Sequence, residues 1–390
     1  METGTRSYSD YGLDVLRGIL PQTADVLEDG MRERLHVGAQ VYVSRNGTAV
    51  ADCGVGEARP GVPMDADSMM LWWSSTKPAT AVAIGQLWEQ GKLDIEERVS
   101  AYIPEFAANG KEEVTLRHLL THTAGFRFAD GRDGFRKGWE EIIARVCAAP
   151  LEEGWTPGQK AGYHPSSSWF ILGEIVRRVD GRPFQAYVRE EIFLPLGMRD
   201  SWVGMPPERY RAYGDRIGIM HNTEGDEPQP IPGLDSEATC SLCVPGGGGR
   251  GPMREMGRFY EALLYGGRLG ETRILSPQTV SALTARHRVG MFDETFRVVL
   301  DWGLGFINDS MIYGRHCSPR TYGHGGARSS VGFADPEHGV VAAVVTNGMP
   351  DDRRHYQRFS RISSAIYEDL GIAEPGSQGR SRARPSTGLT

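Results

Sequence analysis

The chain has 390 residues, and its 50 acidic side chains outnumber its 43 lysines and arginines, so its formal net charge is −7. This acidic balance argues against a nucleic-acid-binding protein, which would carry a basic patch or a basic overall charge. No apolar run approaches the ~20 residues that a membrane-spanning helix needs, and residues 1–20 lack the apolar core of a secretory signal, so we expect a cytoplasmic protein with no membrane partner.

Helices and strands are predicted near both ends of the chain. Apolar residues at helical spacing over 11–35 indicate a helix that breaks near Pro21. A second helix is expected over 354–370, where apolar side chains fall on one side. Strand-like segments on either side of short turns predict two hairpins, formed by 37–43 with 49–55 and by 330–334 with 339–346.

The middle of the chain is predicted to be mostly helical. Apolar side chains recur with a helical period in four segments, which are 116–120, 139–147, 167–179 and 183–193. We therefore expect an α/β domain built from residues 1–95 and 245–372, with an inserted, mostly helical domain over 96–244. Segment 223–235, rich in proline, glycine and acid, is expected to form a long loop, and residues 373–390 a disordered tail.

The strongest local signal for catalysis lies at residues 72–78, just before an apolar helix. Ser74 and Lys77 are three residues apart there, so they share a face of the helix start. A desolvated lysine can be neutral enough to deprotonate a serine, and free N–H groups at a helix N-terminus stabilise developing negative charge. An N-cap serine with an incidental lysine would give the same pattern. Ser75 is a competing nucleophile, but it lies on a different face from Lys77.

Two further segments carry residues that could act beside such a serine. Tyr163 lies between a turn and a helix, and its phenol could act as a general base if neighbouring cations lower its pKa. A buried, structural tyrosine is the alternative. The run 322–327 (Tyr-Gly-His-Gly-Gly-Ala) precedes the C-terminal strand pair, where an N–H could complete an oxyanion hole. A glycine-rich strand entry is the alternative for that run.

Together these segments resemble the serine β-lactamase and penicillin-binding-protein superfamily, in its branch of class C β-lactamases and family VIII carboxylesterases. Ser74 and Lys77 match its Ser-x-x-Lys motif, and Tyr163 matches the tyrosine of its second motif. Segment 114–126 (VTLRHLLTHTAGF) and the glycine-rich passage that begins at Pro245 are also similar to this branch. The resemblance implies an α/β, β-lactamase-like fold, with an antiparallel sheet flanked by helices and an inserted helical domain.

The resemblance also implies a role for each residue of the site. Lys77, with Tyr163, would deprotonate Ser74, which would attack an ester or thioester carbonyl. Tyr163 would then protonate the leaving alkoxide and activate water or another acceptor. Backbone N–H groups of Ser74 and Ala327 would hold the oxyanion. The other expected substrate contacts are Trp73, His164, His324, Gly325 and Gly326. No metal or organic cofactor is implied, and the expected partner is a small-molecule acyl donor, with water, an amine or an alcohol as acceptor.

Two departures from the family pattern concern the substrate. His324 stands where a lysine helps to hold a substrate carboxylate, and a histidine with an ordinary pKa near ~6.5 is mostly neutral at pH 7. Pro165 stands where the second motif carries an asparagine or serine, and proline offers no donor. We therefore expect esters rather than β-lactams. Three alternatives stay open: a transacylase making esters or amides in natural-product biosynthesis, a β-lactamase or D-Ala-D-Ala-type peptidase, and a non-catalytic binding protein.

Three other patterns are weaker. Cys240 and Cys243 form a C-x-x-C that lacks a second ligand pair, and the five cysteines do not indicate a disulfide framework. His118 and His122, four residues apart, lie inside the family-like segment. The glycines of 246–251 satisfy a dinucleotide-binding pattern without a strand before them. We expect none of these patterns to bind a metal or a cofactor.

Overall fold

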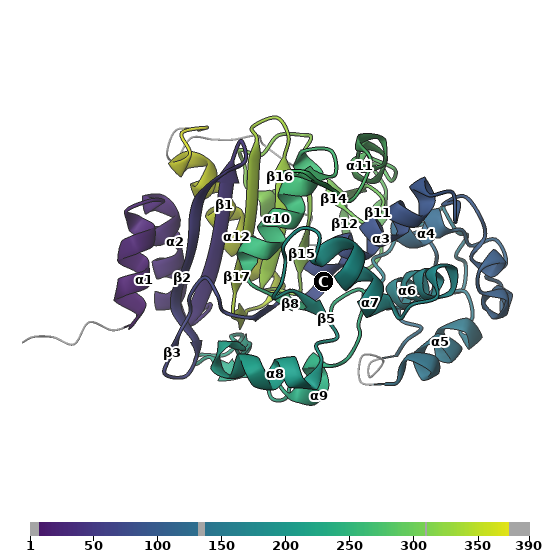
Figure 1. Ribbon diagram of the computed structural model, residues 1–390, viewed down its shortest axis with the longest axis horizontal. Helices are drawn as coiled ribbons and strands as arrows, with labels where there is room; N and C mark the ends of the chain where they lie inside the picture. The colour runs from purple at the N-terminus through teal and green to yellow at the C-terminus, as the bar shows by residue number, and fades with distance from the viewer. Residues whose placement is uncertain (1–7, 132–136, 309, 374–390) are drawn as a thin grey trace, which may run out of the picture.

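The computed structural model describes residues 8–131, 137–308 and 310–373. The tail expected over 373–390 therefore lies outside the described residues, apart from Ala373. The fold is built around an eight-stranded sheet in which all neighbouring strands are antiparallel (Figure 1). In sheet order the strands are β13 (Asp301–Trp302), β14 (Ile307–Asn308), β15 (Tyr322–Gly326), β16 (Ser330–Asp335), β17 (Val340–Thr346), β1 (Gly38–Arg45), β2 (Thr48–Arg59) and β3 (Val62–Pro63).

Both predicted hairpins form, and they meet in the middle of the sheet. β1 and β2 are joined at Asn46 and Gly47, which both have positive φ angles, as the tightest hairpin turns require. β16 and β17 form the second hairpin. β1 also pairs with β17, so that Tyr42 lies opposite Ala343 and the two ends of the chain share one sheet.

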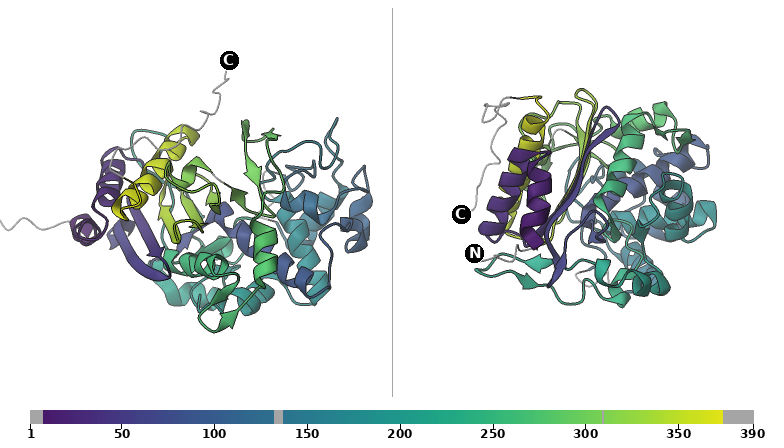
Figure 2. Two further views of the ribbon diagram at one scale, coloured as in Figure 1. Left: turned by 90° about the horizontal axis from the view of Figure 1, so that it is seen from above. Right: turned by 60° about the vertical axis from the view of Figure 1, so that its left-hand side comes forward.

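Helices cover both faces of the sheet (Figure 2). One face carries α1 (Tyr8–Arg17), α2 (Pro21–Arg32) and α12 (Asp352–Asp369), and the other carries α10 (Met253–Leu264). Along β17, alternate residues from Val340 join the core under α1, α2 and α12, and those between them join the core under α10. The expected α/β class is confirmed. The predicted helix break at Pro21 is also confirmed, and its physical reason is that proline is tolerated in the first turn of a helix but not in its interior.

The four helices predicted for the middle of the chain form, with one difference. They are α4 (Leu116–Leu120), α5 (Trp139–Ala148), α6 (Ser167–Asp180) and α7 (Phe184–Val188). The last is shorter than predicted, because Arg189–Phe193 continues as a π-helical turn. Helix α3 (Lys77–Glu89) packs against α6 and is buried along nearly its whole length, as expected for a helix that is apolar all round. The proposed division into domains stays a prediction.

The remaining elements are short. The helices are α8 (Pro207–Tyr213), α9 (Glu237–Cys240) and α11 (Pro277–Thr284), with 3₁₀ turns at Trp73–Thr76, Val99–Ala101, Pro104–Ala107, Gly214–Arg216 and Met311–Tyr313. The strands are β4 (Met70–Leu71), β5 (Trp202–Val203), β6 (His221–Asn222), β7 (Gln229–Pro230), β8 (Gly249–Gly251), β9 (Arg268–Leu269), β10 (Thr272–Arg273), β11 (Phe292–Asp293), β12 (Val298–Val299) and β18 (Gly348–Met349). The expected loop 223–235 contains β7, which pairs with β6, so it is not wholly irregular.

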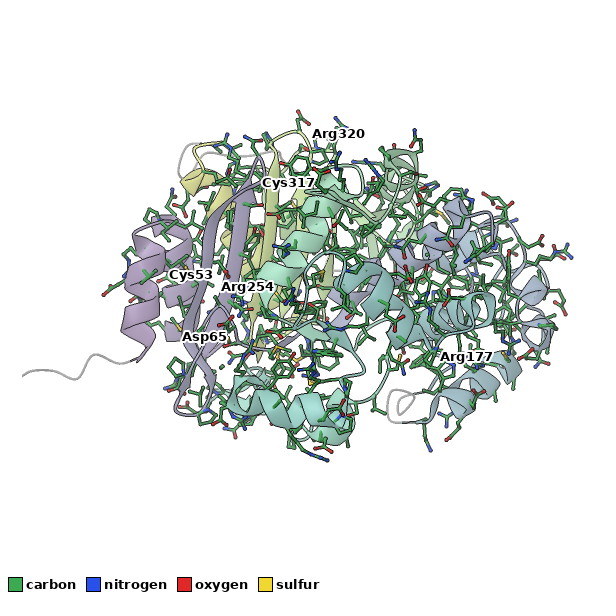
Figure 3. All side chains as sticks on the ribbon, in the orientation of Figure 1. Cys53, Asp65, Arg177, Arg254, Cys317 and Arg320 are labelled. Atoms are coloured by element: carbon green, nitrogen blue, oxygen red, sulfur yellow. The ribbon has the colours of Figure 1, made fainter. Side chains whose placement is uncertain are left out.

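No helix in the described part of the chain is both long and apolar enough to cross a membrane. All five cysteines lie in that part and none is in a disulfide. Figure 3 labels two of them, Cys53 on β2 and Cys317 just before β15, and they lie well apart in that view.

Candidate active site

Ser74 lies in the 3₁₀ turn that leads from β4 into α3. The residue before it, Trp73, has a φ angle of +49°, which a bulky side chain rarely adopts. Thr76 fixes this turn, since its hydroxyl donates to the carbonyl of Trp73 at 2.6 Å and accepts from the N–H of Gly249 at 2.9 Å. The Ser74 side chain is therefore presented from a sharply bent and well-anchored segment.

Lys77 is fully buried and its ammonium nitrogen has three oxygen neighbours. Nζ donates to the carbonyls of Pro165 at 2.8 Å and Gly246 at 2.7 Å, and it lies 3.0 Å from Oγ of Ser74. Burial lowers the pKa of Lys77 well below its ordinary value, against the opposing influence of the Asp130 carboxylate. A neutral amine has two N–H bonds and one lone pair. If both carbonyls keep their hydrogen bonds, the lone pair faces the Ser74 hydroxyl.

Tyr163 packs directly beside this pair. Nζ of Lys77 lies 5.0 Å from the centre of its ring, and a hydrogen bond links its phenol to the side chain of Ser74. The ring stacks on Phe296, with centroids 4.4 Å apart, and contacts His122 at 4.7 Å. Burial raises the pKa of Tyr163, and the Ser74 hydrogen bond only partly offsets that rise. The condition for a role of Tyr163 as a base, a pKa lowered by neighbouring cations, is therefore not met, and a protonated Tyr163 suits an acid better than a base.

Strand β15 lies against the turn that carries Ser74, because Gly326 has no side chain. A Cβ at Gly326 would lie 2.1 Å from the carbonyl oxygen of Trp72 and 3.0 Å from Cβ of Trp73. The same Trp72 carbonyl accepts a hydrogen bond from the hydroxyl of Ser330 at 2.7 Å. The exposed residue Ala327 follows directly after Gly326, at the end of β15. Its backbone is thus carried to the Ser74 turn by the strand.

Ser75 is held away from any catalytic role by its neighbours. It is buried, and its hydroxyl donates to the carbonyl of His324 at 3.1 Å and lies 3.0 Å from the hydroxyl of Ser330. These contacts tie the Ser74 turn to β15 and β16. The structure therefore favours Ser74 over Ser75 as the reactive hydroxyl.

His324 is not an exposed side chain that could hold a substrate carboxylate. It is 1% exposed, and its Nδ1 lies 2.6 Å from the carbonyl of Gly325, so Nδ1 carries the proton. Its Nε2 is buried without a partner among the described residues. Burial, with a smaller contribution from Lys77, lowers the pKa of His324 to about 3. The side chain is therefore neutral, as expected, and its ring contacts those of Tyr163 and Trp302.

His164, also expected to contact the substrate, holds the backbone instead. Its Nε2 accepts from the N–H groups of Gly125 at 3.2 Å and Phe126 at 3.3 Å, and its Nδ1 lies 2.7 Å from the carbonyl of Gly162. Both ring nitrogens are thus occupied, which leaves none for a substrate. Of the other expected contacts, Trp73 is partly buried beside the reactive turn and Gly325 is partly exposed on β15.

Two acidic residues near the site carried no signal in the sequence. Asp130 is buried and accepts a hydrogen bond from Ser166, the residue after Pro165, and its carboxylate acts on Lys77. Asp293 accepts a hydrogen bond from the backbone N–H of Tyr163 at 3.0 Å. Both lie far from Ser74 in sequence, so only the folded chain brings them close.

The two histidines that lie four residues apart, His118 and His122, have structural surroundings. His118 is bound into the N-terminal cap of α4 through Thr115, whereas His122 lies beyond the helix with a φ angle of +58°. The two are therefore not stacked on one helical face. No group of three potential metal-binding side chains occurs in 8–131, 137–308 or 310–373.

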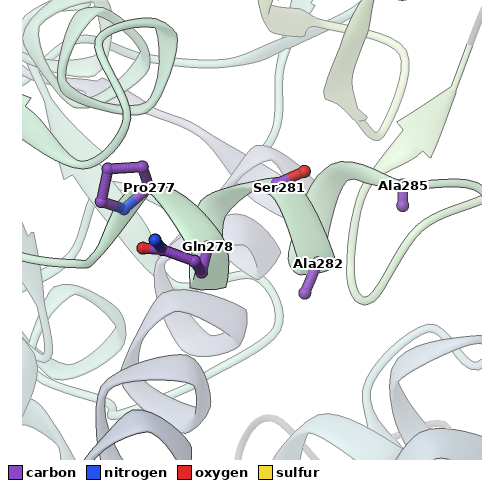
Figure 4. Close-up of a pocket in the computed structure, with 5 residues that line it drawn as sticks. All are labelled: Pro277, Gln278, Ser281, Ala282 and Ala285. Atoms are coloured by element: carbon purple, nitrogen blue, oxygen red, sulfur yellow. The ribbon is translucent and has the colours of Figure 1, made fainter.

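A depression on the outer face of α11, lined by Pro277, Gln278, Ser281, Ala282 and Ala285, has no titratable side chain in its lining (Figure 4).

Five buried histidines with strongly lowered pKa values should make the protein sensitive to mild acid. Burial lowers the pKa to about 3 for His164, His324 and His355, and well below 6.5 for His36 and His122. Between pH 6.5 and about 3 the unfolded chain therefore binds more protons, so stability falls as the pH falls. We expect each such histidine to lower the free energy of unfolding by about 1.4 kcal/mol per pH unit in this range.

Urea unfolding at pH 7.0, 6.0 and 5.0 measures this slope. His355 lies on α12, and the variant His355→Phe should reduce the slope by about 1.4 kcal/mol per pH unit. A free energy of unfolding that stays constant between pH 7.0 and 5.0 would contradict the prediction.

Comparison with known proteins places the chain among serine hydrolases of one fold. Its sequence matches the beta-lactamase family over residues 23–365. It is 29% identical over 338 residues to the esterase/beta-lactamase LipL of Mycobacterium tuberculosis, covering 80% of this chain and 77% of LipL. It is 28% identical over 366 residues to the esterase EstB of Burkholderia gladioli, covering 83% and 88%. The crystal structure of a family VIII carboxylesterase, 29% identical, has a TM-score of 0.77 and covers 90% of this chain and 97% of that one.

Proposed function

The chain belongs to the beta-lactamase family, and from that premise we propose that it cleaves carboxylic esters through an acyl-enzyme formed on Ser74. The resemblance found in the sequence and the β-lactamase-like fold are confirmed by the family match and by the carboxylesterase structure. The chain is a serine esterase or acyltransferase, as the esterase relatives support. What we propose is which residues act and in which order.

One observation carries the proposal: the contacts of the Lys77 amine. Its two carbonyl neighbours, on Pro165 and Gly246, use two N–H bonds and leave the lone pair for the Ser74 hydroxyl at 3.0 Å. Burial lowers the pKa of the amine and so favours its neutral form. A neutral amine at hydrogen-bond distance from a serine is the arrangement that a general base requires.

Acylation would begin when Lys77 takes the proton of Ser74 and Oγ attacks the ester carbonyl. The negative charge that develops on the carbonyl oxygen would be held by the backbone N–H groups of Ser74 and Ala327. Gly326 supports this pairing, because its lack of a side chain lets the end of β15 approach the turn that carries Ser74. When the tetrahedral intermediate collapses, the bond to the leaving alkoxide breaks.

Tyr163 would supply the proton that the leaving alkoxide needs. Its raised pKa keeps the phenol protonated before the reaction, and it can regain its proton from the Lys77 ammonium formed in the first step. Lys77 and Tyr163 thus return to their starting states once the acyl-enzyme has formed. In deacylation Lys77 would take a proton from the attacking water. Tyr163 would give a proton to Oγ of Ser74 as the acid product leaves, and it would regain one from Lys77.

We expect simple carboxylic esters to be better substrates than β-lactams. The third residue of the second motif, Pro165, has no side-chain donor, and its carbonyl is already bound to Lys77. His324 is neutral and buried, so it cannot attract a carboxylate as a lysine would. A site without polar partners for a carboxylate and an amide rejects substrates that depend on them.

Measuring kcat/KM for p-nitrophenyl acetate or butyrate and for a chromogenic cephalosporin tests this expectation. We expect the ester to be favoured by at least about tenfold, since a single lost polar contact is worth about that much. A preference for the cephalosporin would overturn the ester assignment and favour β-lactam hydrolysis, an activity that appears in the name of the relative LipL. Added alcohol or amine in the same assay separates hydrolysis from acyl transfer.

The variant His324→Lys is informative here. Because His324 is 1% exposed and its pKa is lowered in part by Lys77, a lysine in its place would put a second amine near Lys77 in a buried setting. We therefore expect this variant to lose ester activity without gaining activity on the cephalosporin. A gain with the cephalosporin that falls as salt rises would instead place a charged side chain at the substrate.

A further inference from the structure

The backbone of Tyr163 is held by a short segment that starts at Asp293, the last residue of β11, and leads on to β12. Oδ1 of Asp293 accepts from the N–H of Tyr163 at 3.0 Å, and the hydroxyl of Thr295 donates to the carbonyl of Tyr163 at 3.0 Å. Phe296, from the same segment, stacks on the Tyr163 ring. The N–H, the carbonyl and the ring of one residue are thus all contacted by three residues of one short segment.

Asp293 organises this segment as well as binding to it. The same oxygen, Oδ1, also accepts from the N–H groups of Thr295 at 3.0 Å and Phe296 at 2.9 Å. The other oxygen, Oδ2, accepts from Arg288 at 3.0 Å, and both side chains of this ion pair are at most 1% exposed. One carboxylate therefore shapes the turn that carries Thr295 and Phe296 and connects that turn to Tyr163.

Arg288 extends these contacts to the other side of Tyr163. Its Nη1 donates to the carbonyl of Thr121 at 3.1 Å, and its guanidinium lies 5.1 Å from the ring centre of Trp302. Thr121 precedes His122, whose ring contacts Tyr163. The ring of Tyr163 is thus enclosed by two segments, around residues 122 and 296, that the Arg288–Asp293 pair joins to each other.

We propose that Asp293, held by Arg288, is a positioning residue that sets the phenol of Tyr163 at the distance from Ser74 and Lys77 that proton transfer needs. This inference rests on the catalytic role proposed for Tyr163. A proton donor must lie within hydrogen-bond reach of the group that it protonates, and a displacement of about 1 Å can lower a rate by about 10²-fold. Asp293 does not contact the reacting atoms and acts only through Tyr163.

Asparagine at this position cannot satisfy both sets of partners. If its oxygen accepts from the three N–H groups, its NH₂ group faces the buried Arg288 cation, and the reverse orientation points NH₂ at three donors. Asp293→Asn should therefore lower kcat/KM for a p-nitrophenyl ester by about 10²-fold, chiefly through kcat. Thr295→Val removes one hydrogen bond to Tyr163 and keeps the ion pair, and it should cost about three- to tenfold.

A double-mutant cycle with Tyr163→Phe distinguishes a positioning role of Asp293 from a general loss of structure in the variant. If Asp293 acts through Tyr163, Asp293→Asn should lower activity less than threefold further once the phenol is gone. Asp335→Asn is a matched control, since Asp335 is a buried carboxylate that accepts from Ser318 and Tyr367. It lies at the far end of β16, roughly 17 Å along the strand from Ser330 at ~3.3 Å per residue. This control should lose stability but not activity.

Amide hydrogen exchange gives a readout that does not depend on catalysis. In Asp293→Asn, exchange at the amides of Tyr163, Thr295 and Phe296 should accelerate, and in Asp335→Asn it should not. The inference is overturned if folded Asp293→Asn keeps activity within threefold of wild type, if its effect multiplies with that of Tyr163→Phe, or if Tyr163 exchange is unchanged. If the wild type cleaves no ester and takes no fluorophosphonate label, the proposed function fails, while exchange still decides whether Asp293 holds Tyr163.

Discussion

Ser74→Ala should lower kcat/KM for a p-nitrophenyl ester by about 10⁴-fold or more and abolish the covalent adduct formed by a fluorophosphonate. The expectation follows from the Lys77 amine, which lies 3.0 Å from Oγ of Ser74 and has no second hydroxyl among its hydrogen-bond partners in the described structure. Without the hydroxyl there is no atom to carry the acyl group. Mass spectrometry of the intact protein before and after labelling, followed by peptide mapping, measures the adduct and its position.

Ser75→Ala is the matched control for this experiment. Its hydroxyl is directed to the carbonyl of His324 and to Ser330, so we expect labelling at Ser74 to persist and activity to stay within about tenfold of wild type. An adduct that maps to Ser75, or undiminished labelling in Ser74→Ala, would refute the assignment of the nucleophile. Labelling of the wild type would also exclude the non-catalytic alternative.

Lys77→Arg should lower kcat/KM by about 10³-fold or more, through a slower acylation step. Arginine keeps the positive charge but stays protonated, so it offers no lone pair to Ser74. We expect the base form of Lys77 to be the active one. Burial lowers its pKa and so favours that form, and ester turnover should fall as the pH drops and Lys77 becomes protonated.

The measurement is the rate of acylation over a range of pH, with Lys92→Arg as the control. Lys92 is exposed and follows α3, so the same chemical change there should leave acylation unaltered. Lys77→Arg should be slow at every pH. Retention of more than a tenth of wild-type kcat/KM in Lys77→Arg would contradict the role of Lys77 as the base.

Local patterns predicted most of the regular elements. Strand alternation and helix periodicity depend on neighbours within a few residues, and the hairpins β1–β2 and β16–β17 and the break at Pro21 formed as those patterns predict. The prediction was less complete for short segments that depart from the pattern around them. The π-helical turn after α7 and the short strand β7 in the expected loop are two examples.

The sequence by itself determined the family, and it predicted Ser74 and Lys77 as the reacting pair, because a three-residue spacing at a helix start is a local property of the chain. Only the tertiary structure decided how the surrounding residues act. Burial raises the pKa of Tyr163, whereas a role as a base would need a lowered one, and burial lowers the pKa of His324. Asp293 reaches Tyr163 across 130 positions of the chain. Desolvation and contacts between distant residues depend on which segments pack together, and no local pattern of residues encodes them.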